Sequence, residues 1–368
     1  MARSDQLRAL RLPDQDYYLI MRYQHVTLPA IAYELAPIVV QTREIEQKLA
    51  PAWNRLHLPS GQLEALTGIR ERRWWPEGYS VAAGAAAAGR QALATAGLTP
   101  ADIDVMIYAG VCRELYEPAT ACHVAHALGV HSGAAVYDIS NACLGVMNGM
   151  VDIANRIELG QARAGLVVSC ESARDVIELT INRLNANPSM DLFVQSLATL
   201  TGGSGAVAVL LADRRLHANL GGPRLLGGAL QTAPQFHHLC RWGLEKLQGI
   251  GLSEFMTTDA VGVLKHGVDL GLRTWQTFLE RLGWGREQVD RVICHQIGNA
   301  HRETILKTLG LETTCDFSTF PFLGNIGTVS LPLTAAMAAE RGFLRPGDRV
   351  GFLGIGSGLN CLMLGLEW

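Results

Sequence analysis

Short apolar runs rich in β-branched residues alternate with longer alanine-rich stretches along the first half of the chain. The runs are predicted as strands, and the stretches, which have helical apolar spacing, as helices. Strands that alternate with helices are typical of α/β proteins, whose helices cover the faces of a sheet. In chain order, the predicted elements are a strand at Val105–Ala109, a helix at Thr120–Leu128, a strand at Ala135–Ile139, a helix at Leu144–Leu159 and a strand at Ala164–Cys170.

The second half of the chain repeats this plan. Arg291–Cys294 is predicted as a buried strand before a helix that starts near His301, and Arg349–Leu353 as a strand that enters a glycine-rich turn. Two halves of similar plan indicate an internal duplication rather than two unrelated domains. We therefore predict an N-terminal extension over residues 1–20 and two α/β halves, 21–215 and 216–368.

Two segments break the alternation, Ile181–Thr201 and Leu226–Thr258. Both carry turn-forming residues, and both are predicted as insertions between core elements. Insertions of this kind form lids or tunnels over a site, or they elaborate the surface and a dimer contact. The sequence leaves both alternatives open.

Charge and cysteine usage exclude several classes of protein. The 368 residues carry 31 Lys and Arg against 34 Asp and Glu, which gives no electrostatic reason to expect a nucleic-acid partner. No apolar run is long enough to span a bilayer, so no integral membrane segment is predicted. The eight cysteines are scattered, without the paired spacing of disulfide scaffolds or zinc sites. We predict a cytoplasmic protein without a metal ion.

Cys143 is the candidate nucleophile. In the segment D-I-S-N-A-C-L-G, a strand-like run ends in small residues, and a helical run begins at or just after the cysteine. A thiol at a helix N-terminus lies in the positive end of the helix dipole, which lowers its pKa, and nearby N–H groups can stabilise an oxyanion. The alternative is a buried, inert cysteine.

Two residues of the second half can complete such a site. His295 directly follows the predicted strand that ends at Cys294, where sites form at sheet ends, and Asn325 lies between glycines before an alanine-rich segment. Taken singly, they are equally well explained as a core histidine and a capping asparagine. Together with Cys143 they supply a nucleophile, an imidazole and an amide donor.

The segments D-I-S-N-A-C-L-G, H-Q-I-G-N-A-H and G-N-I-G-T-V-S-L-P, in this order, resemble the Cys-His-Asn signature of the thiolase superfamily, in its β-ketoacyl synthase III branch. The segments T-G-I-R-E-R, G-G-S-G-A and G-I-G-S-G resemble further fingerprints of that branch. The resemblance extends from Met21 to Trp368.

The resemblance implies a five-layer αβαβα thiolase fold with two duplicated halves, and a homodimer. It also implies that Cys143 accepts the acyl group while its own N–H and that of Ser357 form the oxyanion hole. His295 and Asn325 would polarise the thioester carbonyl of the second substrate, because a carbanion beside a thioester forms only where preorganised donors meet its charge.

Glu117 distinguishes between branches of the superfamily. Decarboxylating synthases place a phenylalanine before the corresponding proline, on a loop that crosses the dimer interface, whereas here Glu117 precedes Pro118. In this the chain is similar to the acyl-CoA-condensing thiolases of long-chain olefin biosynthesis, whose matching glutamate removes the α-proton of the second acyl chain. A carboxylate facing apolar chains would be a stronger base. The alternative is a solvated glutamate or an ion pair with Arg113.

Two departures concern the carrier of the substrate. Gln62 and Leu66 stand where the synthase branch grips coenzyme A, and Ala300 stands where it docks an acyl carrier protein. The resemblance therefore does not support an acyl carrier protein as a partner, and it leaves the coenzyme A phosphates without assigned residues.

The function predicted from these residues is the non-decarboxylative Claisen condensation of two long-chain acyl-CoA molecules to a 2-alkyl-3-oxoacyl thioester. Acyl-CoA enters as substrate, and no cofactor is predicted. One alternative is a β-ketoacyl synthase III that condenses acyl-CoA with malonyl-carrier protein by decarboxylation. Another is a non-catalytic thiolase-fold partner subunit.

Overall fold

The computed structural model describes residues 21–217, 219–247 and 251–368. The predicted N-terminal extension over residues 1–20 lies outside the described residues. Within them, ten strands form one sheet. Its first half has the order β6 (Ala135–Ile139), β5 (Val105–Ala109), β7 (Ala164–Glu171), β8 (Gly205–Asp213) and β2 (Val26–Leu35). Its second half has the order β9 (Arg224–Thr232), β14 (Asn360–Glu367), β13 (Arg349–Gly356) and β12 (Arg291–Cys294), with β1 (Met21–Arg22) beside β9.

The two halves of the sheet follow the same sequence of strand directions. In the first, β2, β8 and β7 pair antiparallel, and β5 and β6 then join parallel. In the second, β9, β14 and β13 pair antiparallel, and β12 joins parallel. The pairing of Thr27 with Arg224 connects β2 to β9. The boundary predicted between residues 215 and 216 falls between β8 and β9, and it stays a prediction.

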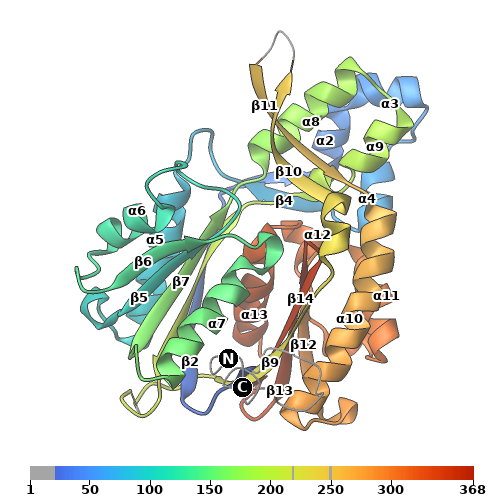
Figure 1. The fold of residues 1–368 in the computed structure, drawn as a ribbon. Helices are drawn as coiled ribbons and strands as arrows, with labels where there is room; N and C mark the ends of the chain where they lie inside the picture. Colours follow the sequence, from blue (N-terminus) through green and yellow to red (C-terminus); the bar gives the residue numbers. More distant parts are fainter. Residues whose placement is uncertain (1–20, 218, 248–250) are drawn as a thin grey trace, which may run out of the picture.

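Helices and sheet halves alternate in five layers (Figure 1). Helices α5 (Val81–Ala96) and α6 (Thr120–Leu128) cover the outer face of the first half of the sheet, and α10 (Ala260–Leu282) and α11 (Asn299–Leu309) cover that of the second. Helices α7 (Gly145–Glu158) and α13 (Ser330–Glu340) lie between the halves. Because α13 is buried on every side, its small residues let both halves of the sheet approach it closely.

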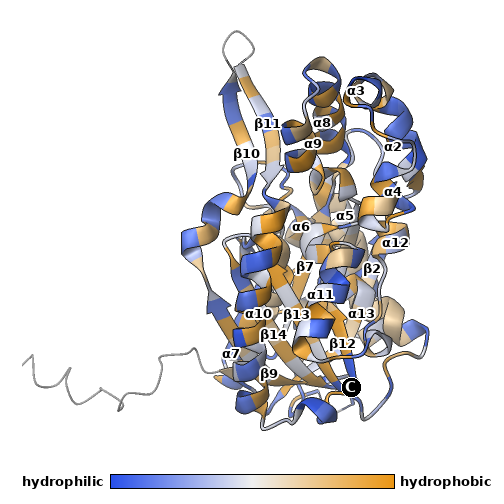
Figure 2. Cartoon of the chain, turned by 90° about the vertical axis from the view of Figure 1, so that its right-hand side faces the viewer, coloured by the Kyte–Doolittle hydropathy of each residue, from blue (hydrophilic) through white to orange (hydrophobic). Residues whose placement is uncertain are grey.

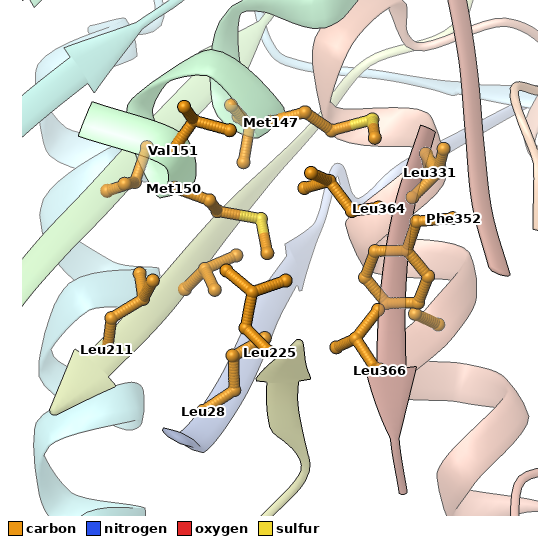
Figure 3. Packing of buried hydrophobic residues seen from close by; sticks show 14 of the residues in the cluster. Leu28, Met147, Met150, Val151, Leu211, Leu225, Leu331, Phe352, Leu364 and Leu366 are labelled. Carbon is orange, nitrogen blue, oxygen red and sulfur yellow. The ribbon is translucent and has the colours of Figure 1, made fainter. Parts of the chain in front are cut away.

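The central core lies where both halves of the sheet meet α7 (Figure 3). Met147 and Met150 from α7 pack with Leu211 of the first half and with Phe352 and Leu364 of the second, and all five side chains are almost fully buried. Full burial of each such side chain contributes about 1.5–3 kcal/mol. This packing fixes α7, and therefore the turn that precedes it, relative to both halves of the sheet.

A cap of helices and a hairpin lies over the carboxyl ends of the strands (Figures 1 and 2). The hairpin of β10 (Cys240–Leu247) and β11 (Gly251–Thr258) projects beside α8 (Arg174–Ala186) and α9 (Met190–Ser196) (Figure 2). The cap comprises α2 (Thr42–Lys48), α3 (Ala50–Leu56), α4 (Gln62–Thr67), α8 (Arg174–Ala186), α9 (Met190–Ser196), α12 (Phe320–Leu323), the pair β3 (Ile38–Gln41) and β4 (Glu71–Trp74), and the hairpin of β10 (Cys240–Leu247) and β11 (Gly251–Thr258). Among the described residues, no helix is both long and apolar enough to cross a bilayer.

The two segments predicted as insertions both belong to this cap, but one prediction was partly wrong. Ile181–Thr201 forms the end of α8, α9 and a 3-10 turn. Leu226–Thr258, however, begins inside β9, a strand of the main sheet. The error arose at Gly227 and Gly228, which look like a turn. A side chain on Gly228 would begin 2.1 Å from the Met363 carbonyl oxygen, so the glycine is required by close strand packing.

Candidate active site

Cys143 lies in a strained turn between β6 and α7. The turn is a 3-10 helix over Ala142–Leu144, and α7 continues directly from Gly145. Ala142 has φ of +44°, in the left-handed region that costs a residue with a side chain roughly 1–2 kcal/mol. The central core stabilises this turn, which places the cysteine at the start of the helix, as predicted.

A cavity of about 480 Å³ opens above this turn. It is lined largely by apolar side chains, and it contains four of the predicted site residues: Cys143, His295, Asn325 and Ser357. We call it the main cavity. The loops of Cys143, His295 and Ser357 follow strands β6, β12 and β13, at whose carboxyl ends sites form in α/β proteins, and the loop of Asn325 follows α12.

His295 follows β12 and is held against β13 by its N–H, which donates to the Leu353 carbonyl over 3.0 Å. Its Nδ1 is buried and has no hydrogen-bond partner among the described residues. Burial, and after it the neighbouring His301, lowers the pKa of His295 to about 4. The imidazole is therefore neutral near pH 7 and able to accept a proton.

Asn325 is fixed by the backbone on both sides. Its N–H donates to the Thr201 carbonyl over 3.0 Å, and its carbonyl accepts from the Gly203 N–H over 2.9 Å. Its side-chain Oδ1 accepts from the Gly327 N–H over 3.0 Å. Because this bond occupies the acceptor end of the amide, the Nδ2 group is the end that can donate to a ligand.

The predicted lowering of the pKa of Cys143 was wrong. Burial, reinforced by Cys240 and Glu171, raises the pKa of the thiol to about 12. One amide at the start of α7 is already bonded, since the Val146 N–H donates to Thr328 Oγ1 over 2.7 Å. Cys143 is therefore a thiol near pH 7, and the neutral imidazole of His295 lines the same cavity.

The loop after β13 lies against the nucleophile. A side chain on Gly356 would begin 3.5 Å from the Cys143 nitrogen, and Ser357 is the next residue. Asn360 ties the two segments together, since its Nδ2 donates to the Ser357 carbonyl over 3.2 Å and to Asn141 Oδ1 over 3.0 Å. This arrangement is compatible with an oxyanion hole formed by the N–H groups of Cys143 and Ser357, which stays a prediction.

Glu117 lies outside the main cavity of its own chain. It is exposed, on the loop between β5 and α6. Among the described residues, no ion pair joins it to Arg113, the partner that the sequence left open. The structure thus brings Cys143, His295, Asn325 and Ser357 together within one chain, but not Glu117.

Glu171, Arg241 and His301 are further ionisable residues that line the main cavity and were missed in the sequence. Glu171 is the last residue of β7, and His301 lies in the first turn of α11. The rule that singled out His295, a polar residue where a buried strand ends, also applies to Glu171. Nothing in the local sequence distinguishes His301 from a surface residue of its helix.

A smaller chamber of about 60 Å³ adjoins the main cavity, and we call it the side chamber. His295, His301 and Ile355 line both spaces. Helices α10 and α11 form the outer wall of the side chamber, which is mostly apolar. His295 and His301 therefore belong to a wall that the two spaces share. In the part of the chain that the structure describes, no group of three or more His, Cys, Asp or Glu side chains is placed to hold a metal ion.

Known proteins resemble this chain over nearly its whole length. Residues 80–193 match the N-terminal domain of thiolase, and residues 279–368 match the C-terminal domain of 3-oxoacyl-[acyl-carrier-protein (ACP)] synthase III. The acyl-CoA:acyl-CoA alkyltransferase of Shewanella oneidensis is 55% identical over 349 residues, which cover 95% of this chain and 100% of the relative. The chain belongs to the acyl-CoA:acyl-CoA alkyltransferase family.

A second alkyltransferase of this family, from Xanthomonas campestris, is 34% identical over the same share of both chains. A crystal structure of Xanthomonas campestris OleA superimposes with a TM-score of 0.88 at 33% identity, covering 94% of this chain and 98% of that one. Another, with bound lauric acid and lauroyl-CoA, superimposes with a TM-score of 0.87 and covers 94% and 100% of the two chains. The predicted thiolase fold and superfamily are thereby confirmed.

Acidification is expected to destabilise this alkyltransferase through His295. The unfolded chain binds a proton there near pH 6.5, whereas the folded protein keeps the imidazole neutral down to about pH 4. The contribution of His295 to the free energy of unfolding is therefore fully present above about pH 6.5. It falls as the pH drops from there toward pH 4, by about 2 kcal/mol at pH 5. Urea unfolding at pH 7 and pH 5 measures the loss, which His295→Asn should reduce. An equal loss in the variant would contradict the assignment.

Proposed function

We propose that this protein condenses two long-chain acyl-CoA molecules to a 2-alkyl-3-oxoacyl-CoA and releases one coenzyme A, without decarboxylation. The observation that carries the proposal is that Cys143, His295 and Asn325 line one cavity whose wall is mostly apolar. A mostly apolar pocket with a few polar groups suits alkyl chains that end in a thioester. The names of the relatives, acyl-CoA:acyl-CoA alkyltransferases, support the same reaction.

In the first half-reaction, Cys143 Sγ attacks the thioester carbon of one acyl-CoA. Its proton passes to the neutral imidazole of His295 and then to the departing coenzyme A sulfur, which leaves as the thiol. The developing oxyanion accepts hydrogen bonds from the N–H groups of Cys143 and Ser357, which the Asn360 side chain keeps adjacent. The product is an acyl group on Cys143.

In the second half-reaction, His295 and Asn325 Nδ2 donate hydrogen bonds to the thioester carbonyl of a second acyl-CoA, which acidifies its α-carbon. Glu117 of the partner subunit removes the α-proton. The carbanion attacks the acyl carbon on Cys143, a carbon–carbon bond forms and the carbon–sulfur bond breaks. The Cys143 sulfur then takes up the proton from Glu117.

We also propose a homodimer, because the loop that carries Glu117 offers apolar side chains to solvent. Leu115 is 52% exposed and Tyr116 is 86% exposed, next to a glutamate outside its own cavity. Adjacent exposed apolar residues are typical of an interface. The eight unpaired thiols favour the cytoplasm as the compartment. No cofactor is required, since acyl-CoA brings both reacting groups.

The decisive experiment incubates the protein with myristoyl-CoA alone. We expect free coenzyme A and a branched 3-oxoacyl thioester, detected by mass spectrometry, without any malonyl donor. A product that appears only when a malonyl thioester is added would instead indicate a decarboxylating β-ketoacyl synthase. A protein that gains no acyl mass on Cys143 would act as a non-catalytic partner subunit.

Filling the side chamber is expected to shorten the acyl chains that are accepted. Gly267 of α10 lines the chamber, and a side chain there would begin 2.9 Å from the end of Ile355. Gly267→Val removes room for about two methylene groups. The rate of product formation from the longest acyl chains should therefore fall about tenfold relative to the rate from the shortest. Product lengths from a mixture of acyl-CoA substrates measure this shift. Gly221→Val, with open space around it, is the control and should leave the distribution unchanged.

A further inference from the structure

Glu171 is a buried carboxyl group that the proposed reaction does not use. It is the last residue of β7, it is 4% exposed, and it lines the main cavity with Cys143. Among the described residues it forms no ion pair. A buried carboxyl without a cation is costly, so its position requires a reason.

The hydrogen bonds of Glu171 supply that reason. Oε1 accepts from the Val111 N–H over 2.9 Å, and Oε2 accepts from the Cys112 N–H over 3.1 Å. These two amides directly follow Gly110, the first residue of the loop that leaves β5 and carries Glu117. Both oxygens thus accept hydrogen bonds from the start of that loop, Val111 and Cys112, which we call its root. Burial raises the pKa of Glu171 while the two N–H bonds oppose the rise.

The same carboxyl also borders the loop that carries Asn325. A side chain on Gly327 would begin 3.5 Å from Glu171 Oε1, and one on Gly110 would begin 3.3 Å from it. Next to the carboxyl, the Ser172 N–H contacts Cys112 Sγ over 3.3 Å. Glu171 therefore sits between the root of the Glu117 loop and the segment that orients Asn325 Oδ1.

We infer that Glu171 is a positioning residue for the condensation step: it holds the root of the Glu117 loop and so determines where Glu117 arrives in the neighbouring subunit. This inference rests on the proposed function. Acylation of Cys143 requires neither the loop nor Glu117, so the loop position that Glu171 fixes matters for the second half-reaction.

Glu171→Gln tests the inference because the amide has one acceptor oxygen. Its NH2 group must face one of the two N–H donors, so one hydrogen bond is lost and the loop shifts. We expect acylation of Cys143, followed by intact mass, to stay within about threefold of wild type, and formation of the branched product to fall by about tenfold or more. Glu171→Asp keeps both acceptor oxygens on a shorter side chain, so formation of the branched product should fall less in this variant than in Glu171→Gln.

Glu46 provides a matched control. It is also buried, at 7% exposure, and its carboxylate accepts from the Gly61 and Leu63 N–H groups, each over 2.7 Å, far from the main cavity in the helical cap. Glu46→Gln makes the same chemical change and should lower both half-reactions equally or not at all. An equal fall of both half-reactions in Glu171→Gln would overturn the inference, and so would unchanged condensation.

Mixed dimers show on which subunit Glu171 acts. In a dimer of one Glu171→Gln chain and one Cys143→Ala chain, the intact Cys143 receives Glu117 from the chain whose Glu171 is intact. Product formation should therefore rise on mixing above that of either variant alone. No rise would mean that Glu171 acts in its own cavity, and the inference would be wrong. If the wild type makes no product from acyl-CoA alone, the proposed function fails, independently of the role of Glu171.

Discussion

Cys143→Ala is expected to remove both half-reactions together. Cys143 is the thiol of the main cavity whose backbone lies against the loop of Ser357, so neither an acyl adduct nor a product should form without it. We expect a loss of at least about 1,000-fold in product formation, as for other enzymes that lose a covalent nucleophile. Intact mass after exposure to myristoyl-CoA, and product analysis, measure the two losses separately.

The matched control for this prediction is Cys122→Ala. Cys122 is an exposed thiol on α6, outside the main cavity, and it is the thiol most accessible to nonspecific acylation. The variant should keep the adduct and the product. An adduct that persists in Cys143→Ala but disappears in Cys122→Ala would show that acyl transfer occurs on the surface, and would contradict the assigned nucleophile.

Much of the fold could be predicted because the pattern of burial is simple. Strands β5 and β6 have the predicted bounds, as does β12. Each is a short run bounded by turn residues, so its period and length leave little choice. Strand β9 could not be predicted in full, because the close packing that requires Gly228 involves Met363, which is remote in the chain.

The site was predictable to a similar degree. Cys143, His295 and Asn325 each stand where a strand or loop ends, and the common edge of the sheet brings them into one cavity. The pKa of the thiol was not predictable. Burial sets its direction, and the side chains that enclose the cavity include Trp242 and Met256 of the hairpin, about 100 positions further along the chain.

The role of Glu117 follows neither from the sequence alone nor from the structure of a single chain. Its position before Pro118 indicates a base for the α-proton, yet in the folded chain it is exposed and does not line the described cavity that contains Cys143. A base must lie within hydrogen-bond distance of the proton that it removes. The two observations agree only if the glutamate serves a neighbouring subunit, which gives the prediction that follows.

Glu117→Gln and Cys143→Ala are each expected to make no branched product, and a mixture of the two is expected to regain activity. Loss of a general base costs about 100- to 10,000-fold, so Glu117→Gln should still acquire an acyl group on Cys143 but fail to condense it. In a mixed dimer, one cavity combines the intact Cys143 of one chain with the intact Glu117 of the other. Random exchange of subunits makes half of the dimers mixed, with one working site in each, so the mixture should reach about a quarter of wild-type activity.

The control is a mixture of Cys143→Ala with His295→Asn. Both residues belong to the same cavity of one chain, so every mixed dimer contains one cavity without the cysteine and one without the histidine, and activity should stay lost. Product formation by the first mixture and not by the second would place Glu117 in the neighbouring subunit. If neither mixture is active although subunit exchange is verified by native mass spectrometry, Glu117 does not act across the interface. If only the first mixture is active, acylation needs one chain and condensation needs two, so the dimer itself is part of the reaction that joins the two acyl chains.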